Sequence, residues 1–256
     1  MNLPAEIYSV ETVRRIDRIA IDEAGIGGYT LMTRAAQAAL SAARARYPDA
    51  RRWQIVCGSG NNGGDGYVLA RLAAREGLAV SVVALAPTDR LTGDAATACR
   101  DLSAEGGAID DWRGELDPDA ELVVDALLGS GLEREVEGAF ADAVAAMNRH
   151  PAPVLGLDIP SGLHGDSGAV MGCAVVADLT VTFVGLKTGL FLGEAKEHVG
   201  ELVFAGLEVP DECRARGEIA LRRIDDSVLR AALPRRARSA HKGDFGHLLL
   251  IGGGPG

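Results

Sequence analysis

The sequence predicts an α/β fold, a three-layer α/β/α Rossmann-like sandwich with a mostly parallel central sheet and two leading N-terminal helices. Short apolar runs, read as buried strands, alternate with helical patterns along the chain, which is typical of a parallel sheet between helical layers. A glycine-rich segment, GSGNNGGDG at residues 58–66, lies between an apolar run at 53–57 and a helical pattern. Strand, glycine loop and helix in this order present backbone N–H groups to an anion.

Length and composition set the class of protein. The chain has 256 residues, enough for one large domain or for one domain and a fragment. Its net charge of −10 gives no reason to expect nucleic-acid or membrane-surface binding. No 18-residue apolar run and no signal-peptide pattern occur. The four cysteines lack metal-site spacing and read as reduced thiols, so we expect a cytoplasmic protein.

The periodicity predicts two helices, over residues 9–24 and 30–47, before the first strand. A helix at 91–105 ends at two glycines, and an acidic surface loop follows over 106–120. The strand at 79–85 is a continuous apolar run and is expected to be buried on both faces. The strands are expected, in order, at residues 53–57, 79–85, 122–128, 154–157, 179–184 and 201–207.

The glycine-rich segment fails the tests of two common nucleotide loops. Gly58, Gly60 and Gly63 satisfy G-x-G-x-x-G, but the acidic residue expected at the end of the next strand is missing, since Asp89 follows only beyond a proline. A P-loop would carry Lys and Ser or Thr where Gly64 and Asp65 stand. Five glycines allow close approach of a ligand and positive φ angles. A tight turn is the alternative, but a turn rarely needs Asn-Asn and Asp as well.

Polar residues also follow three later strands. Asp125 ends one strand, the segment Asp158-Ile159-Pro160-Ser161-Gly162 follows the next, and Lys187 comes after the strand near 179–184. Singly, these are explained by a helix cap, a plain turn and a surface lysine. Together they meet at the carboxyl edge of one sheet, where ligands bind in open α/β folds.

The segment at residues 58–66 resembles the loop of the NAD(P)H-hydrate epimerases. These isomerases interconvert the R and S forms of hydrated NADH or NADPH, a damaged cofactor that carries water on its nicotinamide ring. The resemblance covers about residues 8–209 and implies a homodimer that acts in nicotinamide nucleotide repair. The chain departs from the family at residues 31–36, where Thr33 and Ala36 replace a Glu and a Gly.

The resemblance also implies site residues. A potassium ion is expected at Asn62, Asp125 and Ser161, an oxygen set with one carboxylate that suits a large monovalent cation. Asp158 is the first candidate for the general acid/base, and Lys187 would protonate the leaving group or bind phosphate. Substrate contacts are expected from Asn61, Asn62, Gly63, Gly64, Asp65, Gly129, Ser130, Gly131, Leu132, Glu133, Arg134, Glu135 and Asp158.

Two other functions compete with the epimerase. A nicotinamide-dependent dehydrogenase is disfavoured by the missing acidic residue, and a non-catalytic nucleotide-binding or interaction module of the same fold stays open. The last residues, 241–256, resemble the opening strand of ADP- or ATP-dependent NAD(P)H-hydrate dehydratases, which have a ribokinase-like fold. We therefore expect an epimerase domain at 1–209, then a linker and the start of a dehydratase domain at 210–256, with the rest fused downstream in the full-length protein.

Overall fold

The computed structural model describes residues 3–224, 226–233 and 249 of the chain. The chain divides into two units, residues 1–222 and 223–256. The first unit contains both sheets, and the described part of the second contains helix α8, Asp226–Ala232. The expected dehydratase-like strand within residues 241–256 lies outside the described residues, so its assignment stays a prediction.

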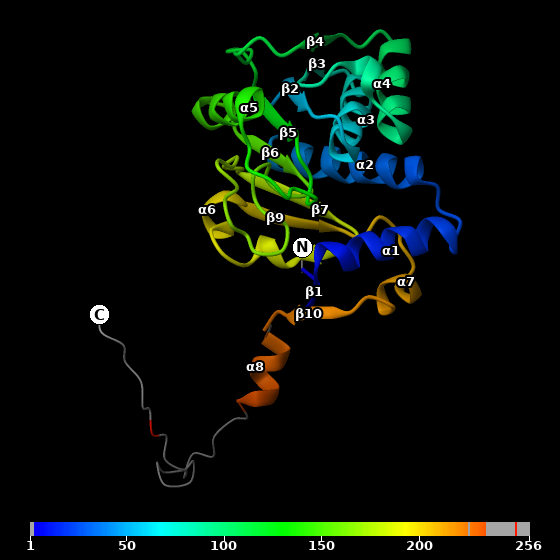
Figure 1. Ribbon diagram of the computed structural model, residues 1–256, viewed down its shortest axis with the longest axis vertical. Coiled ribbons are helices and arrows are strands. Elements are labelled where there is room, and N and C mark those ends of the chain that lie inside the picture. Colours follow the sequence, from blue (N-terminus) through cyan, green and yellow to red (C-terminus); the bar gives the residue numbers. More distant parts are fainter. Residues whose placement is uncertain (1–2, 225, 234–248, 250–256) are drawn as a thin grey trace. The chain divides into compact units, whose positions relative to one another are not determined.

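A seven-stranded sheet forms the centre of the first unit (Figure 1). Its strand order is β4-β3-β2-β5-β6-β7-β9, and every neighbouring pair is parallel. The predicted α/β fold with a mostly parallel sheet is therefore confirmed. The strands are β2 (Arg52–Cys57), β3 (Ala79–Ala84), β4 (Ile109–Asp111), β5 (Leu122–Ala126), β6 (Val154–Leu157), β7 (Leu179–Phe183) and β9 (Glu201–Ala205).

Helices cover both faces of this sheet. Helices α2, α3 and α4 pack on one face, and α5 packs on the other with a second apolar cluster (Figure 1). The core is rich in alanine and aliphatic side chains, as the low aromatic content predicts. The helices are α1 (Val10–Asp22), α2 (Gly28–Arg46), α3 (Asn61–Arg75), α4 (Gly93–Ala104), α5 (Gly138–Arg149), α6 (Ala195–His198) and α7 (Asp211–Ala215), with 3-10 turns at Thr88–Arg90 and Thr188–Leu190.

The strand order reverses beside β2, and this reversal positions the site. From β2 the chain runs outward through β3 to β4, and then returns to β5 on the other side of β2. Such a switch opens a crevice at the carboxyl ends of the two central strands, where open α/β folds bind their ligands. At this point the Gly58 N–H donates to the Ala126 carbonyl over 3.0 Å and joins the two strand ends.

Three short strands form a second sheet that the sequence did not indicate. Its order is β10-β1-β8, with β1 at Glu6–Tyr8, β8 at Leu186–Lys187 and β10 at Ile219–Arg222. The expectation that two helices come before any strand is thus wrong, because β1 precedes α1. Runs of two to four residues are too short to show strand periodicity. The parallel pair of β1 and β8 connects the start of α1 to the segment that carries Lys187.

Two further expectations need correction at the edge of the main sheet. The short strand β4 lies within residues 106–120, which the sequence assigned to a surface loop. Strand β3 is buried only in its second half, because its first residue is exposed and its next two are half-buried. Its neighbour β4 is three residues long and pairs only with residues 82–84 of β3.

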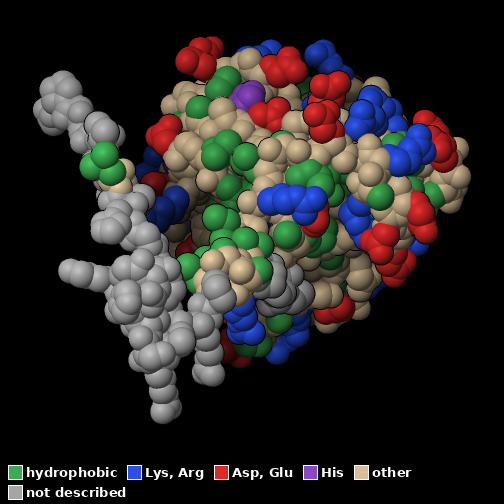
Figure 2. All heavy atoms as spheres, turned by 90° about the horizontal axis from the view of Figure 1, so that it is seen from below, with side chains coloured by type: hydrophobic (Ala, Val, Ile, Leu, Met, Phe, Trp, Pro, Cys, Tyr) green, Lys and Arg blue, Asp and Glu red, His purple; other side chains and the backbone are tan. Residues whose placement is uncertain are grey.

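The surface carries charges of both signs. On the face drawn in Figure 2, Lys and Arg side chains lie among Asp and Glu side chains, with apolar side chains between them. In the described part of the chain, no helix has the length and apolar character needed to cross a membrane.

Candidate active site

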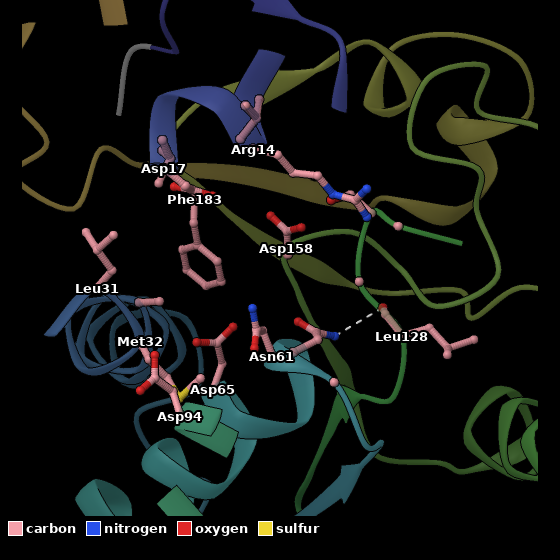
Figure 3. A pocket seen from close by; sticks show the side chains of 18 of the residues that line it. Arg14, Asp17, Leu31, Met32, Asn61, Asp65, Asp94, Leu128, Asp158 and Phe183 are labelled. Atoms are coloured by element: carbon pink, nitrogen blue, oxygen red, sulfur yellow. Dashed lines mark hydrogen bonds between the residues drawn. The ribbon is translucent and has the colours of Figure 1, made fainter. Parts of the chain in front are cut away.

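A cavity of about 860 Å³ opens at the carboxyl edge of the sheet, beside the reversal of strand order. In Figure 3, Arg14 and Asp17 come from α1 on one side of the cavity, and Asn61 and Asp65 come from α3 on the other. Asp158, which follows β6, lies between the two helices. The volume falls in the range of sites that hold a nucleotide-sized ligand.

Helix α3 begins inside the glycine-rich segment, so most of the expected loop is helical. Its first residue is Asn61, and Gly60 is its N-cap. None of the five glycines in residues 58–66 has a positive φ. A Cβ on Gly58 would lie 1.9 Å from the Leu127 carbonyl oxygen, and one on Gly63 would lie 2.1 Å from the Gly58 carbonyl oxygen. These glycines allow backbone segments to approach closely, and the expected need for positive φ is wrong.

The other glycines of the segment let α3 pack tightly. A Cβ on Gly64 would lie 2.5 Å from the Met32 methyl carbon, and one on Gly66 would lie 2.6 Å from the Ala126 Cβ. Gly63 and Gly64 therefore face the protein interior and do not line the cavity. Their effect is to place the N-terminal turn of α3, with its free N–H groups, at the cavity.

Asn62 lines the cavity, and Asp125 and Ser161 lie buried behind it in the same cluster. Both carboxylate oxygens of Asp125 accept hydrogen bonds from Ser161, from its hydroxyl over 2.5 Å and from its backbone N–H over 2.7 Å. The Asn62 amide donates to the Leu128 carbonyl over 3.1 Å. Burial raises the pKa of Asp125 to about 6, although the hydrogen bonds from Ser161 act in the opposite direction.

The oxygen atoms around Asn62 fit the coordination of a monovalent cation. The Asn62 side-chain oxygen is buried and accepts no hydrogen bond. A buried acceptor without a partner is costly, and a cation would satisfy it. The Leu128 carbonyl, the Ser161 hydroxyl and the single carboxylate of Asp125 lie in the same cluster. Among the described residues, no group of three or more His, Cys, Asp or Glu has the arrangement of a metal site, so any ion here relies mainly on neutral oxygens.

An ion pair between a buried lysine and a half-buried aspartate lies next to this cluster. Lys187 is 2% exposed, and its ammonium group pairs with the Asp158 carboxylate. The same ammonium donates to the Phe183 carbonyl over 2.9 Å and to the Thr182 hydroxyl over 3.1 Å. Asp158 has a φ of 68°, a left-handed conformation that is uncommon for a residue with a side chain. Residues held in this way cluster at functional sites, and here the turn directs the carboxylate into the cavity.

The loop after β5 connects these two groups. A Cβ on Gly129 would lie 3.5 Å from the Asn62 Cβ and 4.0 Å from a carboxylate oxygen of Asp158. Gly129 thus separates the α3 N-terminus from the acid by the width of one backbone. A Cβ at this position would be in ordinary van der Waals contact with both side chains.

Helix α1 supplies two groups that the sequence reasoning missed. Arg14 and Asp17 both line the cavity. Burial raises the pKa of Asp17 to about 6; the positive charge of Lys187 opposes this and the negative charge of Asp158 adds to it. The signal was present, because Asp17 lies on the same stripe of α1 as Val13 and Ile21, where an apolar residue is expected.

Arg14 lies at the rim, with its guanidinium against the loop after β5. A Cβ on Gly131 would lie 2.0 Å from the Arg14 Nη2 atom. Among the described residues Arg14 forms no ion pair. It also borders a second cavity of about 260 Å³, so its charge is accessible from both.

Helix α3 contributes a further carboxyl group, Asp65, to the cavity lining. Burial raises the pKa of Asp65 well above its ordinary value, and the charges of Asp158 and Asp17 add to the rise. Among the described residues that line the cavity, Asp17, Asp65 and Asp158 interact with one another and with the one ammonium group there, that of Lys187.

The structure brings most of the predicted site residues to one place. Gly63, Gly64, Asp125 and Ser161 lie beneath the cavity wall, and Glu135 lies outside it. The predicted residues that line the cavity are Asn61, Asn62, Asp65, Gly129, Ser130, Gly131, Leu132, Glu133, Arg134, Asp158 and Lys187.

The fold and the cavity define an α/β protein with a ligand site of the nucleotide-binding kind at a topological switch point. Residues 28–189 match the family model described as YjeF-related protein N-terminus. A relative from Limosilactobacillus fermentum, named NAD(P)H-hydrate epimerase, is 38% identical over 199 residues, which are 75% of this chain and 92% of the relative. The chain therefore belongs to the YjeF-related protein N-terminus family, and the predicted family resemblance is confirmed.

Longer relatives match as well. Proteins named bifunctional NAD(P)H-hydrate repair enzyme Nnr are 40% identical over 256 residues in Escherichia coli and 42% identical over 247 residues in Coxiella burnetii. These matches cover 100% and 96% of this chain, and 50% of each relative. The chain thus spans about half the length of these relatives. The crystal structure of the yeast protein ynu0 has the same fold, with a TM-score of 0.64 and 19% identity over 78% of this chain and 87% of that one.

Proposed function

We propose that this chain is an isomerase that interconverts the R and S forms of hydrated NADH and NADPH. The observation that carries the proposal is the Asp158–Lys187 pair, which faces a cavity at the carboxyl edge of the sheet beside the N-terminus of α3. The names of the relatives support the same reaction class.

The reaction inverts one ring carbon that bears a hydroxyl next to the ring nitrogen. The hydroxyl leaves as water and gives a planar iminium, and water then adds to the other face. Proton transfer to and from oxygen is needed at both stages. Asp158 supplies a carboxylate at the cavity, and Lys187 fixes its orientation and supplies the compensating charge. No electron is gained or lost, so the chemistry requires no hydride acceptor.

The charges of the cavity suggest how the substrate lies. Three interacting carboxyl groups, those of Asp17, Asp65 and Asp158, lie together in the cavity, and in this proposal the uncharged hydrated ring binds beside them. The rim carries Arg14 and Arg134, and the N–H groups at the start of α3 point to the same space. Phosphates of the dinucleotide would bind there, because helix N-termini and guanidinium groups both favour anions.

Potassium is part of the proposal. Asn62, Asp125 and Ser161 would hold the ion together with the Leu128 carbonyl, as the unsatisfied oxygen of Asn62 indicates. When bound, the ion would supply a fixed positive charge that fastens the start of α3 to the loop after β5. The full-length protein, in this proposal, carries a dehydratase domain after the epimerase domain, in keeping with the word bifunctional in the names of the longer relatives. The resemblance adds the expectation of a homodimer.

One experiment separates this function from its two alternatives. NADH is hydrated chemically, the R and S forms are separated by HPLC, and the chain is added to each. Faster conversion of either form to the other supports the epimerase. Oxidation of NADH would support a dehydrogenase, and binding without conversion would support a non-catalytic module.

A further inference from the structure

An inversion places a demand on the site that one carboxyl group does not meet. The hydroxyl leaves from one face of the ring, and the new water arrives on the other. A proton must therefore be handled on both faces while the ring stays bound. A single carboxyl group, such as Asp158 after β6, can face only one side of a bound ring, so a second group is needed.

Asp17 is the candidate for that group that the cavity offers on helix α1. It enters the same cavity as Asp158 but from a different element, the helix α1 (Figure 3). It has no hydrogen-bond or ion-pair partner among the described residues, whereas Asp158 is held by Lys187. Its position is fixed, since the side chain of Val13, one turn earlier on α1, packs against Gly185 beside the strand that carries Lys187.

We propose that Asp17 is the acid/base for the face of the nicotinamide ring opposite Asp158; this rests on the proposed epimerase function. In one direction the Asp17 carboxyl gives its proton to the hydroxyl oxygen, the C–O bond breaks, and water leaves as the ring nitrogen forms the iminium. Water then attacks the carbon from the other face, and the Asp158 carboxylate takes its extra proton. The opposite direction uses the same groups in reversed roles.

The surroundings of Asp17 suit this role. The charged groups that act on it are Lys187 on β8 and Asp158 after β6, and Asp17 in turn acts on Asp65 of α3. The other charged residues that line the same cavity are Arg14, Asp94, Glu133 and Arg134. Burial raises the pKa of Asp17 to about 6, so both protonation states are accessible near neutral pH. Efficient acid/base groups have a pKa near the working pH.

The test follows oxygen exchange and inversion separately in water enriched in ¹⁸O. Each purified epimer of hydrated NADH is incubated with wild-type protein, with Asp17→Asn and with Asp22→Asn, an exposed carboxylate on the same helix that does not line the cavity. Wild type and Asp22→Asn invert both epimers and incorporate ¹⁸O. Asp17→Asn is expected to invert at least about 100-fold more slowly. This variant still exchanges the hydroxyl oxygen of one epimer with the solvent and retains its configuration, because Asp158 serves that face of the ring.

The results that would overturn the inference are distinct. Inversion by Asp17→Asn at the wild-type rate would exclude the role. Equal loss of exchange for both epimers in a variant that still binds NADPH would make Asp17 a structural residue. The one-epimer exchange pattern in Asp65→Asn instead would assign the second face to α3. If wild type itself inverts neither epimer above the uncatalysed rate, the proposed function fails first, and this outcome is recognisable without any variant.

Discussion

Lys187 and Asp158 form an ion pair across 29 residues of sequence, with the lysine buried between Thr182 and the Phe183 carbonyl. A buried ammonium group is tolerated only when it is paired and hydrogen-bonded. The lysine thus fixes the acid at the cavity, and the acid compensates the charge of the lysine.

The first prediction concerns Asp158. Asp158→Asn keeps the shape of the side chain and removes its ability to transfer a proton. We expect kcat for epimerisation to fall by a factor of about 100 or more, with little change in KM. HPLC of the separated epimers measures kcat, and initial rates over a range of substrate concentrations give KM. Near-normal turnover would exclude Asp158 as the acid/base.

The second prediction concerns the stability of the pair. Lys187→Met removes the charged partner of the half-buried Asp158 carboxylate, and we expect a loss of up to about 3 kcal/mol in the free energy of unfolding. The double variant Asp158→Asn, Lys187→Met should recover much of that loss, because neither charge remains. Urea unfolding of the three variants and the wild type forms a double-mutant cycle. Additive losses would mean that the two side chains do not interact.

The third prediction concerns potassium. If Asn62, Asp125 and Ser161 hold the ion, KCl should raise the melting temperature above that in choline chloride at equal ionic strength, because a ligand that binds the folded state stabilises it. Asp125→Asn should lose this difference. Arg14→Ala should retain the difference between the two salts, because Arg14 lines the cavity but is not one of the expected potassium ligands. An equal effect of KCl on Asp125→Asn and wild type would show that the salt acts elsewhere.

The fourth prediction concerns Arg14. Removing this rim guanidinium takes away a charge-assisted contact to phosphate, and we expect KM for hydrated NADPH to rise about tenfold with kcat nearly unchanged. Arg15→Ala is the matched control. Its guanidinium donates to the Arg216 carbonyl over 3.0 Å and does not line the cavity, yet the variant changes the net charge equally. Similar KM values for the two variants would mean that the KM change comes from the net charge of the protein and not from a specific contact of Arg14.

The strand ends that carry Asp125 and Asp158 were predictable from the sequence for a physical reason, whereas Lys187 lies in β8 of the second sheet. Apolar runs that end in a polar residue mark the carboxyl ends of buried strands, and parallel strands bring those ends to one edge. Family resemblance then assigned roles to residues such as Asn62. The helical start of α3 was not predictable, because five glycines in nine residues disfavour a helix by intrinsic propensity. Tight packing against Leu127, Met32 and Ala126 overrides that preference.

Asp17 was missed for a different reason. Its role depends on where α1 lies relative to the sheet, and β1, β8 and β10 determine that position. Strands of two to four residues leave no readable period in the sequence. A carboxylate on an otherwise apolar helical stripe was the available signal, and it indicates only that the residue faces the protein, not which group it meets.

The fifth prediction is that Asp17 destabilises the fold near neutral pH. Its pKa is raised to about 6 from an ordinary value of 3.8, so the folded state binds more protons than the unfolded state between these values. Protonated Asp17 therefore adds to the free energy of unfolding at low pH, and this contribution is lost as the pH rises from about 4 to above 6. Asp17→Asn removes the ionisable group, and we expect its melting temperature to exceed that of the wild type at pH 7.5 and to match it near pH 4. Asp22→Asn should show no such difference between the two pH values.

An Asp17→Asn variant that is less stable than the wild type at pH 7.5 would mean that the charged carboxylate has a stabilising partner. A gain in stability together with a loss of inversion is the pattern expected of a carboxyl group retained for chemistry rather than for folding.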